Sequence, residues 1–171
     1  MKQAVRQQMI KLRKSLDVHQ KQAFDHHIIM QIRADERYQQ ADTVAIFYPM
    51  VHEIDLRDLM TDHKTFLFPK VIKDDIVFYP YQKEMRFTKS TFGVYEPKSA
   101  SPFTAQIDYM LVPALAVDSK GHRIGYGKGF YDRYLAIHRP KTTIGVIYPF
   151  QLIDEIDYSD IDQPLDGYMK G

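Results

Sequence analysis

The first sixteen residues follow the period of an α-helix. Apolar side chains recur at steps of four, three and four positions, at Val5, Met9, Leu12 and Leu16. At 3.6 residues per turn this spacing places them on one stripe. The pattern predicts an amphipathic helix over residues 2–16 that packs its apolar stripe against the rest of the protein.

Basic residues form a neighbouring stripe of the same helix. Arg6 and Arg13 follow Lys2 at offsets of four and eleven positions. Both offsets return close to the same angle around the helix axis. On spacing alone, a solvated helix face explains Lys2 and Arg6 most simply.

A second helix is predicted directly afterwards. Asp17 suits the N-cap position, because its carboxylate accepts hydrogen bonds from N–H groups of the first turn. From there a helical pattern runs to about Tyr38, with Phe24, Ile28 and Ile32 facing inward. Two N-terminal helices are therefore expected before the rest of the fold.

From residue 43 onward the period changes. Short runs rich in β-branched and aromatic residues, most ending in proline or a polar turn, predict strands at residues 43–48, 65–68, 76–79, 109–112 and 143–148. Residues 54–63 and 131–138 are helical candidates between them. Apolar strands that alternate with helices indicate an α/β fold with a mainly parallel, doubly covered sheet. Since such sheets bind ligands outside the carboxyl ends of their strands, the chemistry is expected after Tyr48 and Val112.

The composition narrows the class of protein. The chain has 171 residues, 44% hydrophobic and 26% charged, and we expect one domain over residues 1–171. Its 23 basic and 22 acidic side chains give a formal charge of +1, so nucleic acid is not an expected partner. Cysteine is absent, which excludes thiol catalysis and cysteine-bound metals. No apolar run approaches about 20 residues, so we expect a cytoplasmic protein without a secretory signal or a membrane partner.

Two common catalytic patterns are missing from the sequence. The 7 His are scattered, with no HExxH motif for a zinc site. No G-x-S-x-G nucleophile elbow occurs, so an α/β-hydrolase has no support.

The most informative segment is residues 111–135, where a buried strand leads through a glycine-rich loop into a helix. The loop holds Gly121, Gly125, Gly127 and Gly129. Glycines let backbone N–H groups approach an anion, and a helix N-terminus adds the positive end of a dipole. Arg123 and Lys128 bracket the loop with two cations, and Asp132 follows where a carboxylate could hold Mg²⁺. These residues suit a polyphosphate.

Known nucleotide-binding motifs do not account for this loop. GxGxxG fails because Phe130 and Tyr131 follow Gly129. The P-loop motif fails because Gly129, and not Ser or Thr, follows Lys128. A phosphate site here would be of another type, and a plain flexible connector is the alternative on these residues alone.

A known family has a loop of this other type. The string RIGYGKGFYDRYL, preceded by VPALAVDSKGH, closely resembles the signature of the 5-formyltetrahydrofolate cyclo-ligase family. Other family elements follow in the same order: the first helix with Lys2 and Arg6, FYPMVHEID with Glu53, FGVYEP at residues 92–97, and the closing residues 151–166. The resemblance covers nearly the whole chain. It implies a three-layer α/β/α arrangement related to the doubly wound, Rossmann-like sheets.

The resemblance also implies an activity. Family members convert 5-formyltetrahydrofolate to 5,10-methenyltetrahydrofolate with ATP and Mg²⁺, releasing ADP and phosphate. The γ-phosphoryl group activates the formyl oxygen, N10 attacks the formyl carbon, and the ring closes. The expected partner is thus a small folate, with or without a polyglutamate tail, bound by a monomer; a dimer stays open.

Carried onto this sequence, the resemblance assigns roles to individual residues. Lys128 and Arg123 would be the catalytic cations, with Lys128 neutralising the transferred phosphoryl group. The nucleotide would contact Lys2, Arg6, Arg123, Gly125, Tyr126, Gly127, Lys128, Gly129, Phe130 and Tyr131. The folate would face Tyr48, Glu53, Tyr126 and Phe130. Asp132 and Asp162 would hold Mg²⁺.

Taken singly, these residues allow plainer interpretations. Glu53 alone is explained by a carboxylate in the first turn of a helix, where the dipole favours it. Asp132 alone is explained by a charge at the start of its helix. Only the order of the family's elements along the chain makes these residues one site.

The closing segment departs from the family pattern. A proline and a histidine that family members carry near the metal-binding Asp correspond here to Asp157 and Ile161. Asp162 also lies in an acidic run. Asp160 and Asp166 therefore stay open as alternatives to Asp162.

Two other functions stay open on the sequence. One is a folate- or nucleotide-binding protein that keeps the fold without turnover; Arg123, Lys128 and Asp132 argue against it, and the altered closing segment argues for it. The other is a small-molecule kinase on a similar fold, which no P-loop or kinase motif supports.

Overall fold

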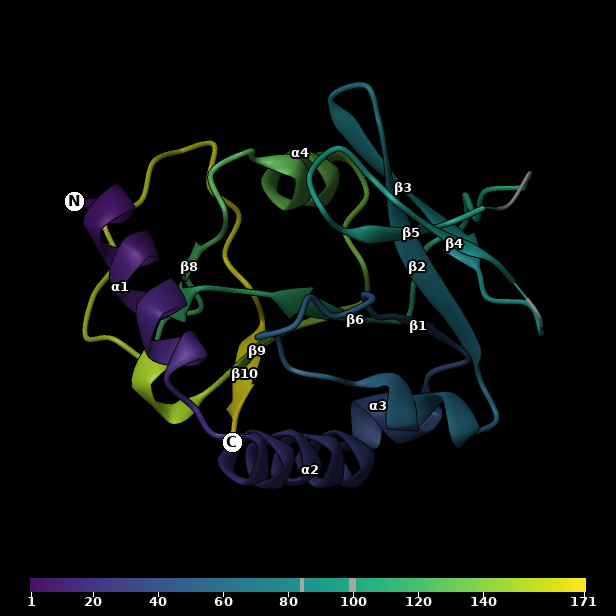
Figure 1. Cartoon of the computed structure of the whole chain (residues 1–171). Coiled ribbons are helices and arrows are strands. Elements are labelled where there is room, and N and C mark those ends of the chain that lie inside the picture. The colour runs from purple at the N-terminus through teal and green to yellow at the C-terminus, as the bar shows by residue number, and fades with distance from the viewer. Residues whose placement is uncertain (84, 99–100) are drawn as a thin grey trace.

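The computed structural model describes residues 1–83, 85–98 and 101–171, and its centre is a six-stranded sheet in the order β10-β9-β6-β1-β2-β3 (Figure 1). The strands are β1 (Thr43–Ala45), β2 (Thr65–Ile72), β3 (Asp75–Pro80), β6 (Tyr109–Pro113), β9 (Thr142–Ile147) and β10 (Gly167–Lys170). Neighbouring strands are parallel, except that β3 is antiparallel to β2 at one edge. The predicted mainly parallel sheet is confirmed.

The sheet is buried on both faces. On β6, Tyr109 and Leu111 belong to an apolar cluster that includes Ile28 of the second helix. Met110, the residue between them, belongs to a different cluster with Leu135 of the last helix. Strand side chains alternate between faces, so a sheet covered twice needs continuous apolar runs. Figure 1 shows α2 and α3 on one side of the sheet and α4 (Phe130–Ile137) on the other, which confirms the predicted three layers.

Helix α1 (Lys2–Lys14) is the predicted amphipathic helix, two residues shorter than expected. Its apolar stripe packs Met9 against Ala116 and Ile124, which belong to a small two-stranded unit after β6. This unit consists of β7 (Ala116–Val117) and β8 (Arg123–Ile124), paired antiparallel. As a result α1 lies beside the glycine-rich segment.

The second predicted helix is broken in two. Asp17 caps α2 (Val18–Ala34) as expected, accepting from the N–H of Gln20 at 2.8 Å. The predicted continuation to Tyr38 is wrong, because Asp35 has an extended backbone and caps a new short helix, α3 (Glu36–Gln40). The hydroxyl of Tyr109 also donates to the Asp35 carboxylate at 2.9 Å, which fixes the break against β6. No helix of the described residues has both the length and the apolar character to cross a bilayer.

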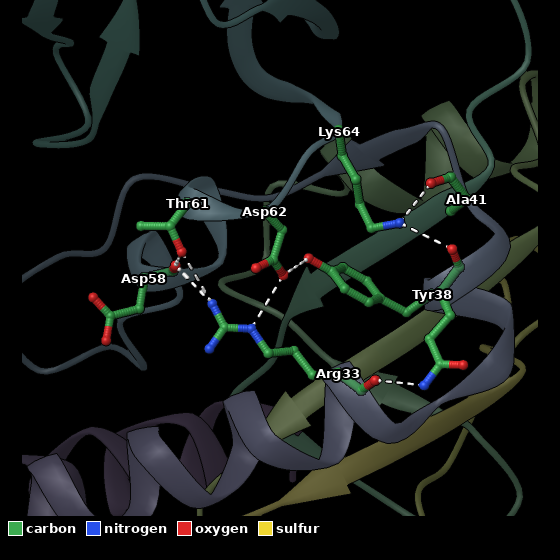
Figure 2. A network of polar contacts seen from close by, with 8 residues as sticks. Arg33, Tyr38, Ala41, Asp58, Thr61, Asp62 and Lys64 are labelled. Atoms are coloured by element: carbon green, nitrogen blue, oxygen red, sulfur yellow. Dashed lines mark hydrogen bonds and ion pairs between the residues drawn. The ribbon is translucent and has the colours of Figure 1, made fainter.

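A polar network fastens α2 and α3 to the segment before β2 (Figure 2). Asp62 accepts from Arg33 Nε at 3.1 Å and from the Tyr38 hydroxyl at 2.6 Å. Lys64 donates to the carbonyl of Ala41 at 2.7 Å. Ala41 and Lys64 precede the first residues of β1 and β2, so this network closes the amino ends of the strands. The opposite ends remain available for a ligand.

The predicted helix over residues 54–63 is also wrong. Only a single 3-10 segment, η1 (Arg57–Thr61), forms there. Ile54 and Leu56 are both buried in the same apolar cluster. Residues two apart lie on opposite sides of an α-helix, so an α-helix could not bury both. The small sheet of β4 (Phe87–Lys89) and β5 (Tyr95–Pro97) was not predicted.

The order of the parallel strands locates the ligand site. β2, the second parallel strand along the chain, lies on one side of β1. β6, the third, lies on the other side of β1. The connections therefore diverge between β1 and β6. In doubly wound sheets ligands bind outside the carboxyl ends of the strands at such a switch point.

Candidate active site

A cavity of about 870 Å³ lies at the carboxyl ends of β1 and β6. Its walls include Phe47, two residues after β1, and Pro113 at the end of β6, together with α1, the β4–β5 turn, the glycine-rich loop and residues 160–163. Every residue that the sequence analysis placed in the site lines it: Lys2, Arg6, Tyr48, Glu53, Arg123, Gly125, Tyr126, Gly127, Lys128, Gly129, Phe130, Tyr131, Asp132 and Asp162. The fold thus gathers residues from four distant segments around one space.

Lys2 and Arg6, the first two residues of the basic stripe of α1, line this cavity. Arg6 Nε donates to the carbonyl of Gly125 at 2.8 Å. Lys2 Nζ lies 3.0 Å from the Asp162 carboxylate. These contacts join the first helix to segments more than a hundred residues later, so the two side chains do not form a merely solvated face.

Arg123 places a cation deep in the cavity wall. Its Nη1 donates to the carbonyl of Pro113 at 3.2 Å, while its buried Nε has no partner among the described residues. Burial lowers the pKa of the Arg123 guanidinium, and the charges of Asp132 and Asp162 oppose that shift. A guanidinium nevertheless stays charged in proteins. A partly buried cation with an open donor suits an anionic ligand.

The glycine-rich loop connects Arg123 to the N-terminus of α4. Gly127 has φ +99° and Gly129 has φ +72°, a backbone conformation that residues with a side chain rarely adopt. A Cβ on Gly127 would also lie 3.3 Å from the guanidinium carbon of Arg6. Gly129 is the N-cap of α4 and offers no side-chain acceptor. The first N–H groups of α4 are therefore open to a phosphate.

Glu53 places a buried carboxylate in the wall of the same cavity. It is 6% exposed, and its two oxygens accept from the Met50 N–H at 2.9 Å and from the Tyr126 hydroxyl at 3.2 Å. Burial raises the pKa of Glu53, although these hydrogen bonds and the charge of Arg13 oppose the shift. Glu53 lies outside any helix, so its interpretation as a first-turn carboxylate is wrong.

Aromatic rings surround the same part of the cavity. Tyr48 packs against Phe87 and Tyr95, with ring centroids 5.0 Å apart in both pairs. Phe92, in the turn between β4 and β5, lies 5.8 Å from Phe130, centroid to centroid. Phe92 was not among the predicted site residues, and only the FGVYEP string pointed to its segment. Of these rings, Tyr48, Phe92 and Phe130 line the cavity and offer flat apolar surfaces for a planar ligand.

Two carboxylates lie near the cations. Asp132 accepts from the N–H of Gln163 at 3.1 Å, and Asp162 accepts from the N–H of Ser159 at 3.0 Å. Asp160 also lines the cavity. Asp166, the other alternative, is excluded because it accepts from the N–H of Thr143 at 2.8 Å at the start of β9 and does not line the cavity.

The described residues hold no group of three acidic or histidine side chains suited to a metal. Mg²⁺ usually binds proteins through one or two carboxylates and takes its other ligands from water and phosphates. Asp132 and Asp162, beside the cationic residues, fit that requirement.

A further residue that the sequence analysis missed supports the loop from behind. Asp118 is 1% exposed and accepts from the N–H groups of Lys120 and His122, both at 3.0 Å, and of Ile156 at 3.1 Å. Burial alone would raise its pKa, but these donors outweigh burial and hold the pKa of Asp118 below its ordinary value. Asp118 therefore ties the turn before Arg123 to the closing segment.

Replacement of Asp118 by asparagine is expected to lower the free energy of unfolding by about 2 kcal/mol, because an amide cannot accept all of these hydrogen bonds. A carboxylate with a lowered folded-state pKa stabilises the fold above its unfolded pKa of about 3.9 and loses that contribution below it. The difference between wild type and Asp118→Asn should thus shrink as the pH falls through 4. Urea unfolding of both proteins at pH 7 and pH 3.5 measures this difference in stability. Equal stability at pH 7 would contradict the stabilising role of Asp118.

The chain is similar to known proteins along nearly its whole length. The model of the 5-formyltetrahydrofolate cyclo-ligase family matches residues 1–169. A 5-formyltetrahydrofolate cyclo-ligase of Haemophilus influenzae is 26% identical over 99% of this chain and 97% of its own length. One from Mycoplasma pneumoniae is 29% identical over 88% of this chain and 87% of its own length.

Two solved structures share the fold along nearly the whole chain. The 5,10-methenyltetrahydrofolate synthetase of Aquifex aeolicus has a TM-score of 0.87 at 26% identity, covering 99% of this chain and 89% of that one. The Mycoplasma pneumoniae synthetase has a TM-score of 0.77 at 27% identity, covering 98% and 96%. From residue 1 to residue 169, the chain belongs to the 5-formyltetrahydrofolate cyclo-ligase family.

Proposed function

We propose that residues 1–171 act as one domain that converts 5-formyltetrahydrofolate to 5,10-methenyltetrahydrofolate with ATP and Mg²⁺, releasing ADP and phosphate. The observation that carries the proposal is the single cavity of about 870 Å³. It combines a group of cations beside a helix N-terminus with a buried carboxylate among aromatic rings. The first set suits a polyphosphate and the second a pterin.

The nucleotide part of the cavity explains how phosphoryl transfer could be promoted. Lys2, Arg6 and Arg123 would hold the phosphates, and the N–H groups of residues 125–131 would surround them. Lys128 would neutralise the γ-phosphoryl group as it moves to the formyl oxygen. Charge stabilisation and positioning are the main contributions of a protein to such a step.

The folate part would hold the acceptor. Glu53 can accept two parallel hydrogen bonds from the aminopyrimidinone edge of the pterin. Tyr48, Tyr126 and Phe130 would pack against the ring faces. With the pterin fixed, N10 lies close to the activated formyl carbon, attacks it, and the phosphate leaves as the five-membered ring closes.

Asp132 and Asp162 would hold the metal. Mg²⁺ supplies positive charge on the phosphate oxygens. Lys2 lies against Asp162 at 3.0 Å, so this lysine would balance the second carboxylate. Since residues of one chain line the cavity, a monomer suffices for the reaction. The proposed location of the enzyme is the cytoplasm.

The direct test is an absorbance assay. The purified protein is mixed with 5-formyltetrahydrofolate, ATP and Mg²⁺, and the near-ultraviolet absorbance of the methenyl product is followed. We expect a rise that requires all three additions. In Asp132→Asn, the Mg²⁺ concentration for half-maximal rate should increase about tenfold.

Two outcomes would favour the alternatives. No rise from a folded protein that still binds folate or ATP would indicate a binding protein without turnover. A stable phosphorylated product, without free phosphate, would indicate a small-molecule kinase.

A further inference from the structure

Arg13 is a buried cation that does not line the large cavity. It is 7% exposed, and its Nε has no partner among the described residues. Its Nη2 donates to the hydroxyl of Tyr126 at 2.8 Å. The guanidinium carbon also lies 5.6 Å from the centroid of the Tyr126 ring. Arg13 therefore contacts the wall of the site from behind.

The chain of contacts continues into the site. The Tyr126 hydroxyl, which accepts from Arg13, donates to Glu53 at 3.2 Å. A hydroxyl has one proton, so accepting from a guanidinium directs that proton to the carboxylate. Without the contact to Arg13 the Tyr126 hydroxyl could rotate, because the residue is 40% exposed.

We propose that Arg13 is a positioning residue for the folate: through the Tyr126 hydroxyl it fixes the orientation and the charge of the Glu53 carboxylate. This inference rests on the proposed function of Glu53. It gives the third basic residue of the α1 stripe a role separate from that of the first two. Arg6 binds Gly125 on the nucleotide side, and Arg13 binds the next residue, Tyr126, on the folate side.

The surroundings of Glu53 make Arg13 its main charged neighbour. Charged or titratable groups that act on Glu53 come from α1, α2, the glycine-rich loop, α4 and the end of β9: Arg13, Lys21, Tyr126, Tyr131 and Tyr148. Lys21 is already paired with Asp25 at 2.6 Å. The tyrosines are neutral, and burial raises the pKa of each of them. Removing Arg13 thus removes the positive charge that acts most strongly on the buried Glu53 carboxylate.

The test is the absorbance assay on Arg13→Met, with Lys11→Met as the control that removes an exposed charge from the same helix. We expect the KM for 5-formyltetrahydrofolate to rise about tenfold, the effect of one charge-assisted hydrogen bond, while the KM for ATP stays within about twofold. The acid-side rise of the folate KM should also move to higher pH, because Glu53 would protonate more easily. Arg13→Lys should restore the pH profile in part.

A second variant covers the case in which Arg13→Met folds poorly. Tyr126→Phe keeps the guanidinium but removes the hydroxyl that links it to Glu53, so it should raise the folate KM with little change in the KM for ATP. The double variant should lose no more than Tyr126→Phe alone. The inference is overturned if the folded Arg13→Met enzyme keeps the wild-type folate KM and pH profile, or if both KM values change alike. An inactive wild type would instead overturn the proposed function.

Discussion

Replacement of Lys128 by alanine is expected to lower kcat at least about 100-fold and to leave the KM for 5-formyltetrahydrofolate nearly unchanged. Removing one charged donor aimed at a developing transition-state charge has an effect of this size. Lys128 is exposed and lines the cavity, and its Nζ lies 5.6 Å from the centroid of Phe92. Its side chain is thus free to move toward a phosphoryl group without breaking an ion pair among the described residues.

The matched control is Lys120→Ala. Lys120 is an exposed lysine of the same segment that does not line the cavity, so its removal should change kcat by less than about twofold. Lys128→Arg keeps the charge but changes its geometry, and its kcat should fall between those of wild type and Lys128→Ala. If Lys128→Ala retains the wild-type kcat and loses only affinity for ATP, Lys128 binds ATP in the ground state. Arg123 would then neutralise the transferred phosphoryl group.

The sequence was most informative where one local pattern decides the structure. The stripe of Val5 and Met9 predicted α1, and the capping preference of Asp17 predicted the start of α2. Continuous apolar runs predicted strands buried on both faces, and the sheet order confirms a doubly wound arrangement. The candidate site residues, which line one cavity, were proposed because a long family motif spans the glycine-rich loop and α4, not because single residues were distinctive.

The errors arose where tertiary contacts override local preference. Residues 36–38 are helical as predicted, but Asp35 breaks the helix because its carboxylate binds the hydroxyl of Tyr109, 74 positions away. Helical spacing failed at residues 54–63 because the core buries both Ile54 and Leu56. Neither contact is visible in a local window of sequence.

Arg13 shows a different limit of sequence reasoning. The stripe with Lys2 and Arg6 was apparent, but its position two turns further along the helix did not reveal its partner. That partner became visible only when α1 was placed against the glycine-rich loop, where Tyr126 accepts from Arg13. The role proposed for Arg13 thus depends on the segment against which α1 packs, and not on the sequence of α1 itself.

Replacement of Glu53 by glutamine is expected to raise the KM for 5-formyltetrahydrofolate about 100-fold, with the KM for ATP unchanged. An amide cannot accept two hydrogen bonds from the pterin edge, and the loss of charge-assisted bonds of about 3 kcal/mol corresponds to a factor of this size. Asp58→Asn, which removes an exposed carboxylate outside the cavity, should change neither KM. Initial rates at varied folate and at varied ATP separate these outcomes.

The pH dependence gives an independent check of the same residue. Burial raises the pKa of Glu53, and only the ionised form accepts both pterin hydrogen bonds. Folate binding by the wild type should therefore weaken as the pH falls through this raised pKa, whereas Glu53→Gln should have a high folate KM without that acid-side change. Measuring both enzymes and Asp58→Asn over the same series of pH values on the acid side of neutrality cancels the titration of the folate itself. If Glu53→Gln keeps the wild-type acid limb, another group controls the pterin, and the assignment of Glu53 is wrong.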